Sequence, residues 1–245
     1  MRMKRYAMLD SIRGLILISM IVYHAVWDIV YIYGVDWQWY HSRFAYYWQQ
    51  SICWGFIFLS GFCWSFGRKK WKRGLMVFAA GLLITVVTAV AMPENIVIFG
   101  VLTLLGTCML LLIPLDQYLC KCNPFLGMGI SLVLFVITKN INIGSLGFGS
   151  WELCTLPKDL YANWFTTYIG FPMSGFYSTD YFSVFPWMFL FVAGYYLHKV
   201  FVDKKLLEYC RHFKNNVLEW IGKHSLIIYL LHQPVIYIVL MLIFI

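Results

Sequence analysis

The chain alternates between long apolar segments and short polar ones. About 20 consecutive apolar residues cross the hydrocarbon core of a bilayer as one helix. We therefore expect about seven spans, at 9–33, 45–66, 74–92, 96–114, 124–139, 181–200 and 218–244. The pattern predicts an all-α fold, a polytopic transmembrane helix bundle that forms a single domain over residues 1–245.

One long segment, residues 140–180, separates the fifth and sixth predicted spans. Its first part is rich in Gly, and its second part is aromatic and contains Pro172 and Gly175. Gly and Pro in such a setting mark turns and loops. We expect a structured external loop or lid here, rather than an eighth span.

Composition supports a membrane protein. The chain is 61% hydrophobic and 12% charged, with a mean hydropathy of +0.71, whereas soluble domains average about 25% charged residues. A formal net charge of +8 can indicate a nucleic-acid partner, but these charges follow the ends of the predicted spans. We expect a lipid bilayer as partner and no nucleic acid.

Most of the 19 Lys and Arg residues lie on one side of the predicted membrane. That side holds Arg2, Lys4, Arg5, Arg68, Lys69, Lys70, Lys72, Arg73, Lys121, Lys199, Lys204, Lys205, Arg211 and Lys214. Only Arg43, Lys139 and Lys158 lie on the other. Cytoplasmic loops carry the excess of positive charge, so we expect a cytosolic N-terminus and a multi-pass protein of the plasma membrane. The basic clusters could also attract a nucleotide such as coenzyme A.

The seven cysteines do not suggest a metal site. Several lie in apolar runs, where Cys acts as a small hydrophobic residue. Cys120 and Cys122 form a single CxC element without a second pair, and structural zinc needs four ligands. We expect no metal.

Four ionisable residues lie in the first predicted span: Asp10, Arg13, His24 and Asp28. At about 100° per residue they share an arc of about 60°. At about 1.5 Å per residue the stripe is roughly 27 Å long. A charged group near the membrane centre costs several kcal/mol, so this face is expected to line the bundle interior or a water-filled cleft.

The spacing within the stripe suggests two pairs. Asp10 and Arg13 are three residues apart and can form an ion pair, which could also simply end the helix among the headgroups. His24 and Asp28 are four apart, and a carboxylate beside an imidazole raises its basicity, as a general base requires. The plainer alternative for His24 is a buried histidine bonded to a neighbouring carbonyl.

Other polar residues are candidates for substrate or donor binding. His232 and Gln233 lie in the last span, before Pro234, where a kink is expected because Pro removes a backbone donor. They could line an acceptor or acyl pocket, or join two helices by hydrogen bonds. Asp180 could orient an external acceptor or cap a helix.

Four stretches of the chain resemble the heparan-α-glucosaminide N-acetyltransferase catalytic-domain family, within the integral-membrane acyltransferase superfamily, and more closely the family's small bacterial branch, long of unknown function. They are "RYAMLDSIRGLILISMIVYHAVWD", "FGVLTLLGTCMLLL", "FYSTDYFSVFPWMFLFVAGYYL" and "LEWIGKHSLIIYLLHQPV". Ten residues separate Arg13 from His24, a spacing similar to the Arg-x10-His signature of the superfamily. The resemblance implies His24 as catalytic base and Arg13 as a structural or donor-binding residue. It also offers His41, in the loop after the first span, for the role of base.

The resemblance implies transfer of an acyl group, most simply acetyl, from cytosolic acyl-CoA to an amine or hydroxyl group. Acyl-CoA would be a co-substrate, with no covalently bound cofactor, and the acceptor an envelope glycan or a lipid-linked sugar. Two other classes stay open: a proton-coupled transporter or lipid-handling protein, and a non-catalytic membrane partner. A homodimer is also left open.

Overall fold

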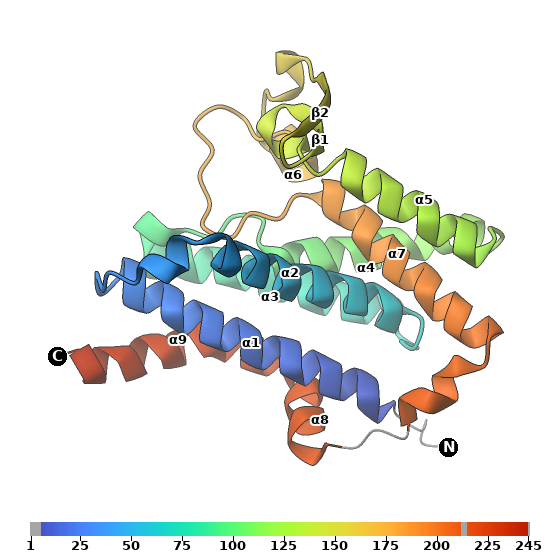
Figure 1. The fold of residues 1–245 in the computed structure, drawn as a ribbon, viewed down its shortest axis with the longest axis horizontal. Helices are drawn as coiled ribbons and strands as arrows, with labels where there is room; N and C mark the ends of the chain where they lie inside the picture. The colour runs from blue at the N-terminus through green and yellow to red at the C-terminus, as the bar shows by residue number, and fades with distance from the viewer. Residues whose placement is uncertain (1–5, 212–214, 245) are drawn as a thin grey trace. The chain divides into compact units, whose positions relative to one another are not determined.

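The computed structural model describes residues 6–211 and 215–244 (Figure 1). Arg2, Lys4, Arg5 and Lys214, on which the predicted orientation partly rests, lie outside the described residues. The all-α prediction is confirmed. The long helices are α1 (Ala7–Tyr31), α2 (Arg43–Trp64), α3 (Lys70–Ala91), α4 (Val101–Leu119), α5 (Pro124–Ile137), α7 (Val184–Asp203) and α9 (Ser225–Phe244).

Shorter elements join these helices. Two of them are α-helical, α6 (Trp164–Ile169) and α8 (Asn216–Lys223). One antiparallel hairpin consists of β1 (Ser145–Phe148) and β2 (Trp151–Thr155). The 3-10 turns are η1 (Gln38–His41), η2 (Pro93–Asn95), η3 (Ile141–Ile143), η4 (Lys158–Leu160) and η5 (Leu206–Arg211).

Within the described residues, six helices are long and apolar enough to cross a membrane. They are α1, α3, α4, α5 with its extension to Ile143, α7 and α9. The second of the seven expected spans forms as α2, but α2 is not among the six. Its N-terminal half carries Arg43, Gln49 and Gln50 among bulky aromatic residues, which lowers its hydropathy. The chain is a polytopic membrane helix bundle.

Two boundaries differ from the predicted ranges. The predicted seventh span is broken at His224, which ends α8 before α9 begins, and Pro234 lies inside a continuous α9. The predicted fourth span begins late, at Val101, because residues 96–99 are non-helical and bond to a distant segment. At the start of α4, bonds to residues 178–182, rather than a loss of hydrophobicity, set the boundary.

The backbone divides into two compact units. The first contains residues 1–59 and 201–245, and the second contains residues 60–200. Each unit has its own packing, and the expected single-domain organisation remains a prediction.

In the first unit, α8 lies against the N-terminal half of α1 (Figure 1). Two glycines allow this close approach: a Cβ at Gly14 would lie 2.3 Å from the carbonyl oxygen of Leu218, and one at Gly222 would lie 1.9 Å from that of Asp10. Both distances are far below van der Waals contact, so any side chain at either position would push the helices apart.

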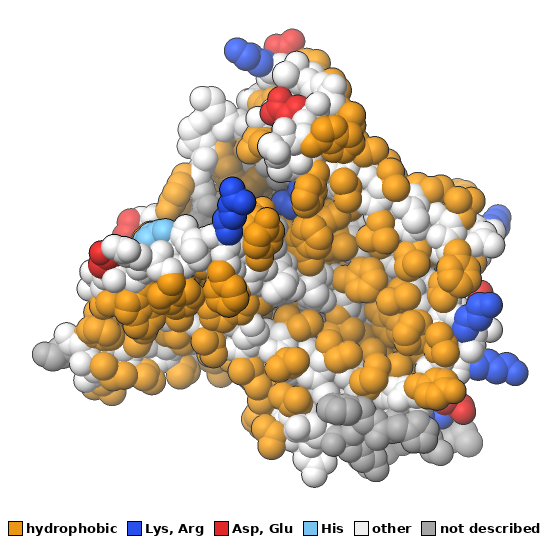
Figure 2. Space-filling model, in the orientation of Figure 1, with side chains coloured by type: hydrophobic (Ala, Val, Ile, Leu, Met, Phe, Trp, Pro, Cys, Tyr) orange, Lys and Arg blue, Asp and Glu red, His pale blue; other side chains and the backbone are white. Residues whose placement is uncertain are grey.

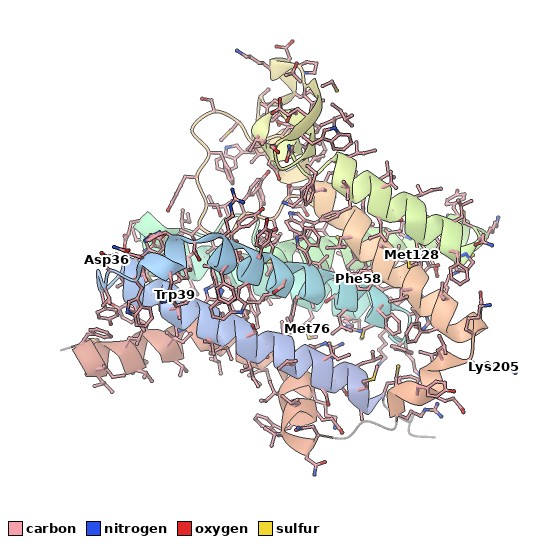
Figure 3. All side chains as sticks on the ribbon, in the orientation of Figure 1. Asp36, Trp39, Phe58, Met76, Met128 and Lys205 are labelled. Atoms are coloured by element: carbon pink, nitrogen blue, oxygen red, sulfur yellow. The ribbon has the colours of Figure 1, made fainter. Side chains whose placement is uncertain are left out.

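An aromatic cluster packs the other end of α1 against η1 and the start of α2. The ring of Tyr23 lies 5.4 Å from that of Tyr40 and 5.2 Å from that of Trp48. Trp39 stacks on Trp48 at 6.4 Å and is labelled among these side chains in Figure 3. Trp48 also donates its indole N–H to Ser19 Oγ on α1, at 2.8 Å. The edge-to-face contact of Tyr23 with Trp48 and this bond join α1 to α2.

In the second unit, α3 and α4 form a tightly packed antiparallel pair. A Cβ at Gly81 would lie 2.5 Å from Thr103 N, and one at Gly106 would lie 2.5 Å from Phe78 Cα. The helix α7 is largely buried. Over α5 and α7 the visible surface is mainly hydrophobic (Figure 2), as a lipid-facing surface requires.

The segment between α5 and α7 is structured, with the β1–β2 hairpin, η3, η4 and α6. Its last residues return to the start of α4. Thr179 N donates to Ile96 O at 3.1 Å, and Phe182 N donates to Phe99 O at 2.9 Å. These bonds hold residues 96–99 in a non-helical conformation.

Candidate functional site

The polar stripe on α1 packs against other helices of the first unit. Asp28 has an exposed fraction of 0%, while His24, Asp10 and Arg13 are half-buried. Within the first unit, α8 covers the N-terminal part of α1 and α9 covers its C-terminal part. These contacts cover Asp28 fully and the other three residues in part.

The expected ion pair at the N-terminal end of the stripe forms. Arg13 Nη1 lies 3.1 Å from Asp10 Oδ1, and both side chains are largely screened from solvent. The carbonyl of Asp10 is also the atom against which Gly222 of α8 packs. This pair therefore lies at the α1–α8 contact, where it neutralises two charges that would otherwise be buried alone.

The expected pairing of Asp28 with His24 is wrong. Both carboxylate oxygens of Asp28 accept hydrogen bonds from Gln233 Nε2 on α9, at 2.7 and 2.9 Å. A primary amide can satisfy a fully buried carboxylate without adding a charge. The i,i+4 spacing makes the His24–Asp28 contact possible, but an amide from a distant helix reaches the carboxylate instead.

The ring of His24 lies against a second histidine. The centroids of the His24 and His232 rings are 5.0 Å apart, with planes inclined at 60°. The ring of Tyr23 also contacts that of His24, edge to face, with the centroids 6.3 Å apart. His24 makes no hydrogen bond in the described part of the chain, so the alternative of a histidine satisfied by a neighbouring carbonyl does not hold for the ring nitrogens of His24.

Two buried atoms beside this pair of histidines have no hydrogen-bond partner among the described residues: Nε2 of His232 and Oε1 of Gln233. Nδ1 of His232 lies 2.5 Å from the carbonyl oxygen of Tyr229. A carbonyl oxygen only accepts, so Nδ1 carries the hydrogen and Nε2 presents a lone pair. The amide of Gln233 donates to Asp28, so its oxygen is likewise a free acceptor.

The arrangement is thus rich in acceptors and poor in donors. A carboxylate, an imidazole lone pair and an amide oxygen come from α1 and α9, whereas α9 contributes no Lys or Arg. Leaving a buried acceptor unpaired costs about 1–3 kcal/mol. A group that carries several N–H or O–H donors is the chemical complement of this site.

His41 lies in η1 and is exposed. Its ring contacts those of Tyr31 at 6.1 Å and Tyr40 at 6.2 Å. In the described chain it has neither a ring contact nor a hydrogen bond with His24. The two candidate bases therefore do not act as one contacting pair.

Asp180 belongs to the second unit, where its carboxylate caps α4. Oδ2 accepts a hydrogen bond from Val101 N at 3.3 Å, and Gly100 leaves room for it. Burial raises the pKa of Asp180 to about 6, although the bond from Val101 opposes this shift. Of the two expected roles, the structure shows helix capping, but of α4 rather than of the helix that follows Asp180.

A polar cluster in the second unit was missed from the sequence. Asp116 accepts a hydrogen bond from the hydroxyl of Tyr195, at 2.5 Å, and lies 3.4 Å from Lys70 Nζ. Lys70 Nζ also lies 3.5 Å from the ring centroid of Trp64. Asp116 is the one acidic residue in α4, a signal that could have indicated a buried polar contact. These bonds join helices of the second unit, and no reacting group is required to explain them.

No group of three or more His, Cys, Asp and Glu side chains that could hold a metal ion is found among the described residues. The pair Cys120 and Cys122 is exposed, and each thiol lies near a backbone carbonyl of α4.

Apolar helices that enclose ionisable groups define a polytopic membrane protein with a polar interior site. The family model described as heparan-alpha-glucosaminide N-acetyltransferase, catalytic, matches residues 5–234. The match covers nearly the whole chain and both units, so the chain belongs to this family of membrane acetyltransferases. No curated protein and no solved structure matches the chain.

Proposed function

We propose that the protein is an integral-membrane acyltransferase of the plasma membrane. It transfers an acetyl group from cytosolic acetyl-CoA to an amine or hydroxyl of an envelope glycan or lipid-linked sugar. The observation that carries this proposal is His24, an imidazole without a hydrogen bond, held on a protein-covered face beside buried acceptor atoms. Membership of the acetyltransferase family supports the type of reaction.

In the proposed reaction, His24 is the general base. The acceptor nitrogen or oxygen attacks the thioester carbonyl carbon, and its proton passes to the free imidazole nitrogen. The carbon–sulfur bond breaks as the tetrahedral intermediate collapses, and the departing thiolate takes the proton from His24. The products are an amide or ester and free coenzyme A, so His24 returns to its neutral form.

The buried acceptor atoms favour an acceptor substrate with several polar hydrogens. The carboxylate of Asp28 and Oε1 of Gln233 can receive such hydrogens. We assign these residues to orienting the substrate. Arg13, paired with Asp10, lies at the end of α1 that the positive-inside rule assigns to the cytosol. That place suits a donor-binding role, and the neighbouring basic loops could attract the phosphates of acetyl-CoA.

The test uses the full chain in lipid nanodiscs with labelled acetyl-CoA and with glucosamine or glucose as acceptor. Release of free thiol and transfer of label are measured together. We expect transfer in the wild type and a loss of at least about 100-fold in His24→Ala, because positioned bases contribute about 10²- to 10⁴-fold. His224→Ala is the control, since His224 is an exposed histidine.

Different results separate the alternatives. Transfer by His24→Ala together with its loss in His41→Ala would move the base to His41. Proton-driven uptake without any dependence on acetyl-CoA would favour a transporter and reject the acyltransferase proposal. If transfer occurs, mass spectrometry of envelope glycans with and without the protein identifies the modified sugar.

A further inference from the structure

The tautomer of His232 leaves one of its nitrogens without a partner. Because Nδ1 donates to the carbonyl of Tyr229, Nε2 is an unprotonated acceptor, and it is buried without a hydrogen bond among the described residues. An unsatisfied buried acceptor needs an explanation, since nearly all such atoms have a donor.

The donor cannot be the neighbouring Gln233. The two hydrogen bonds from its Nε2 go to the carboxylate oxygens of Asp28, and its remaining polar atom is an acceptor. His24 is the nitrogen-bearing ring in contact with His232, at 5.0 Å between centroids. At this separation the ring edges come within hydrogen-bond reach once the nitrogens face one another.

Other titratable groups around His24 do not compete for this bond. On α1 these are Tyr23, in ring contact with His24, and Asp28, bound to Gln233. From α9 come His232 and Tyr229, and the helix carries no charged residue. The part of α2 in this unit has Arg43 in its first turn, together with Tyr46, Tyr47 and Cys53. No Asp or Glu side chain in these three helices is bonded to His24.

We propose that His232 is a positioning residue for His24. It accepts a hydrogen bond from one ring nitrogen of His24, which leaves the lone pair of the other nitrogen facing the reactant. When His24 takes the proton of the acceptor group, the imidazolium keeps this bond, and its charge is spread over the pair. His232 thus fills the place expected for Asp28. The catalytic consequence rests on the proposed function, whereas the hydrogen bond between His24 and His232 does not.

The neutral partner has a physical consequence. A carboxylate holding His24 would stabilise the imidazolium strongly and hold its proton, whereas an imidazole lone pair orients the ring without adding a full negative charge. In the resting structure the rings touch without a hydrogen bond. Catalytic hydrogen bonds often shorten only when a substrate is bound.

Two substitutions separate the roles of the two nitrogens. His232→Asn keeps an N–H group near the position of Nδ1, for the carbonyl of Tyr229, and removes the acceptor at Nε2. His232→Gln can place an amide oxygen near the position of Nε2. The control is His224→Asn, because Nδ1 of His224 also faces a helix carbonyl, that of Trp220 at 2.8 Å.

For wild-type enzyme and variants in nanodiscs, we expect His232→Asn to lower kcat about 100-fold, at the lower end of the contribution of a positioned base. KM for acetyl-CoA should change less than about twofold. In His232→Gln, kcat should be about tenfold higher than in His232→Asn, because the restored acceptor again orients His24. A fall in both variants to the same level, or a rise in KM with unchanged kcat, would reject a positioning role. The folded fraction of each variant is checked by its unfolding midpoint.

A second measurement needs no turnover. The chain has six histidines, so ¹⁵N-histidine labelling with single substitutions assigns the ring signals by NMR. We expect His232→Asn to shift the ring-nitrogen signals of His24 and its protonation midpoint, and His224→Asn to leave both unchanged. Identical His24 signals in wild type and His232→Asn overturn the proposal. Absence of acetyl transfer in the wild type would instead reject the proposed function, while the NMR result still decides whether the pair exists.

Discussion

The most informative perturbation of this structure is the removal of the amide that holds Asp28. In Gln233→Leu the buried carboxylate loses both of its hydrogen bonds, of 2.7 and 2.9 Å, while the side-chain volume is nearly kept. The side chain of Asp28 has an exposed fraction of 0%, so water cannot replace the lost donors without opening the contact between α1 and α9.

The expected loss follows from the charge on Asp28. Hydrogen bonds to charged groups contribute about 1.5–3 kcal/mol each, and stranding one buried charge costs about 3–5 kcal/mol. We therefore expect Gln233→Leu to lower the free energy of unfolding by about 3–5 kcal/mol. The double variant Asp28→Leu with Gln233→Leu strands no charge, and replacing both partners by apolar groups is nearly neutral, so its loss should be about 1 kcal/mol or less.

The assay is reversible unfolding in mixed micelles of mild detergent and dodecyl sulfate, followed by circular dichroism. Gln50→Leu is the matched control, because Gln50 is half-buried and accepts a hydrogen bond from Trp54 at 3.0 Å, with no charge involved. Its expected loss is about 0.5–1.5 kcal/mol. If Gln233→Leu is no less stable than the control, or if the double variant is less stable than Gln233→Leu, the claim of a buried, amide-held carboxylate is refuted.

Two other predictions concern stability. Burial raises the pKa of Asp180 to about 6 from an ordinary value of 3.8, so the folded state binds a proton more tightly than the unfolded state, and the free energy of unfolding should fall as the pH rises from about 4 to about 6. Asp180→Asn, which keeps an acceptor for Val101, should remove this slope in a pH series of unfolding midpoints; a persistent slope would mean that another group titrates. Gly222→Ala places a methyl group 1.9 Å from the carbonyl of Asp10 and should cost about 1–3 kcal/mol, whereas Gly129→Ala, with nothing within 4 Å, should be neutral or stabilising by up to about 1 kcal/mol because Ala favours helix. Equal midpoints for these two glycine variants would contradict the close packing of α8 on α1.

Much of the site could be predicted from one helix. The periodicity of α1 places its four ionisable residues on one face, and the cost of exposing them to lipid requires that protein cover this face. The Asp10–Arg13 pair follows from the same local geometry and is observed. These inferences hold because they depend only on helix geometry and on the low dielectric of the membrane interior.

The partners from other helices were much less predictable. The last span suggested that His232 and Gln233 could line a pocket, but not that Gln233 would take the carboxylate of Asp28 from His24. Asp28 and Gln233 are 205 residues apart in the sequence, so no local pattern connects them. Nor does the sequence near Asp180 reveal that its carboxylate caps a helix that begins 79 residues earlier.

By itself, the sequence determined the class of this protein. Long apolar runs must form helices whose backbone groups are satisfied internally, since a bilayer offers them no hydrogen bonds, and the charges within those runs must turn toward protein. Only the tertiary structure decided where α4 begins, which helix Asp180 caps and which group Asp28 binds. The physical reason is that each ionisable side chain has several partners within its local reach, and the one chosen depends on which distant helix packs against it.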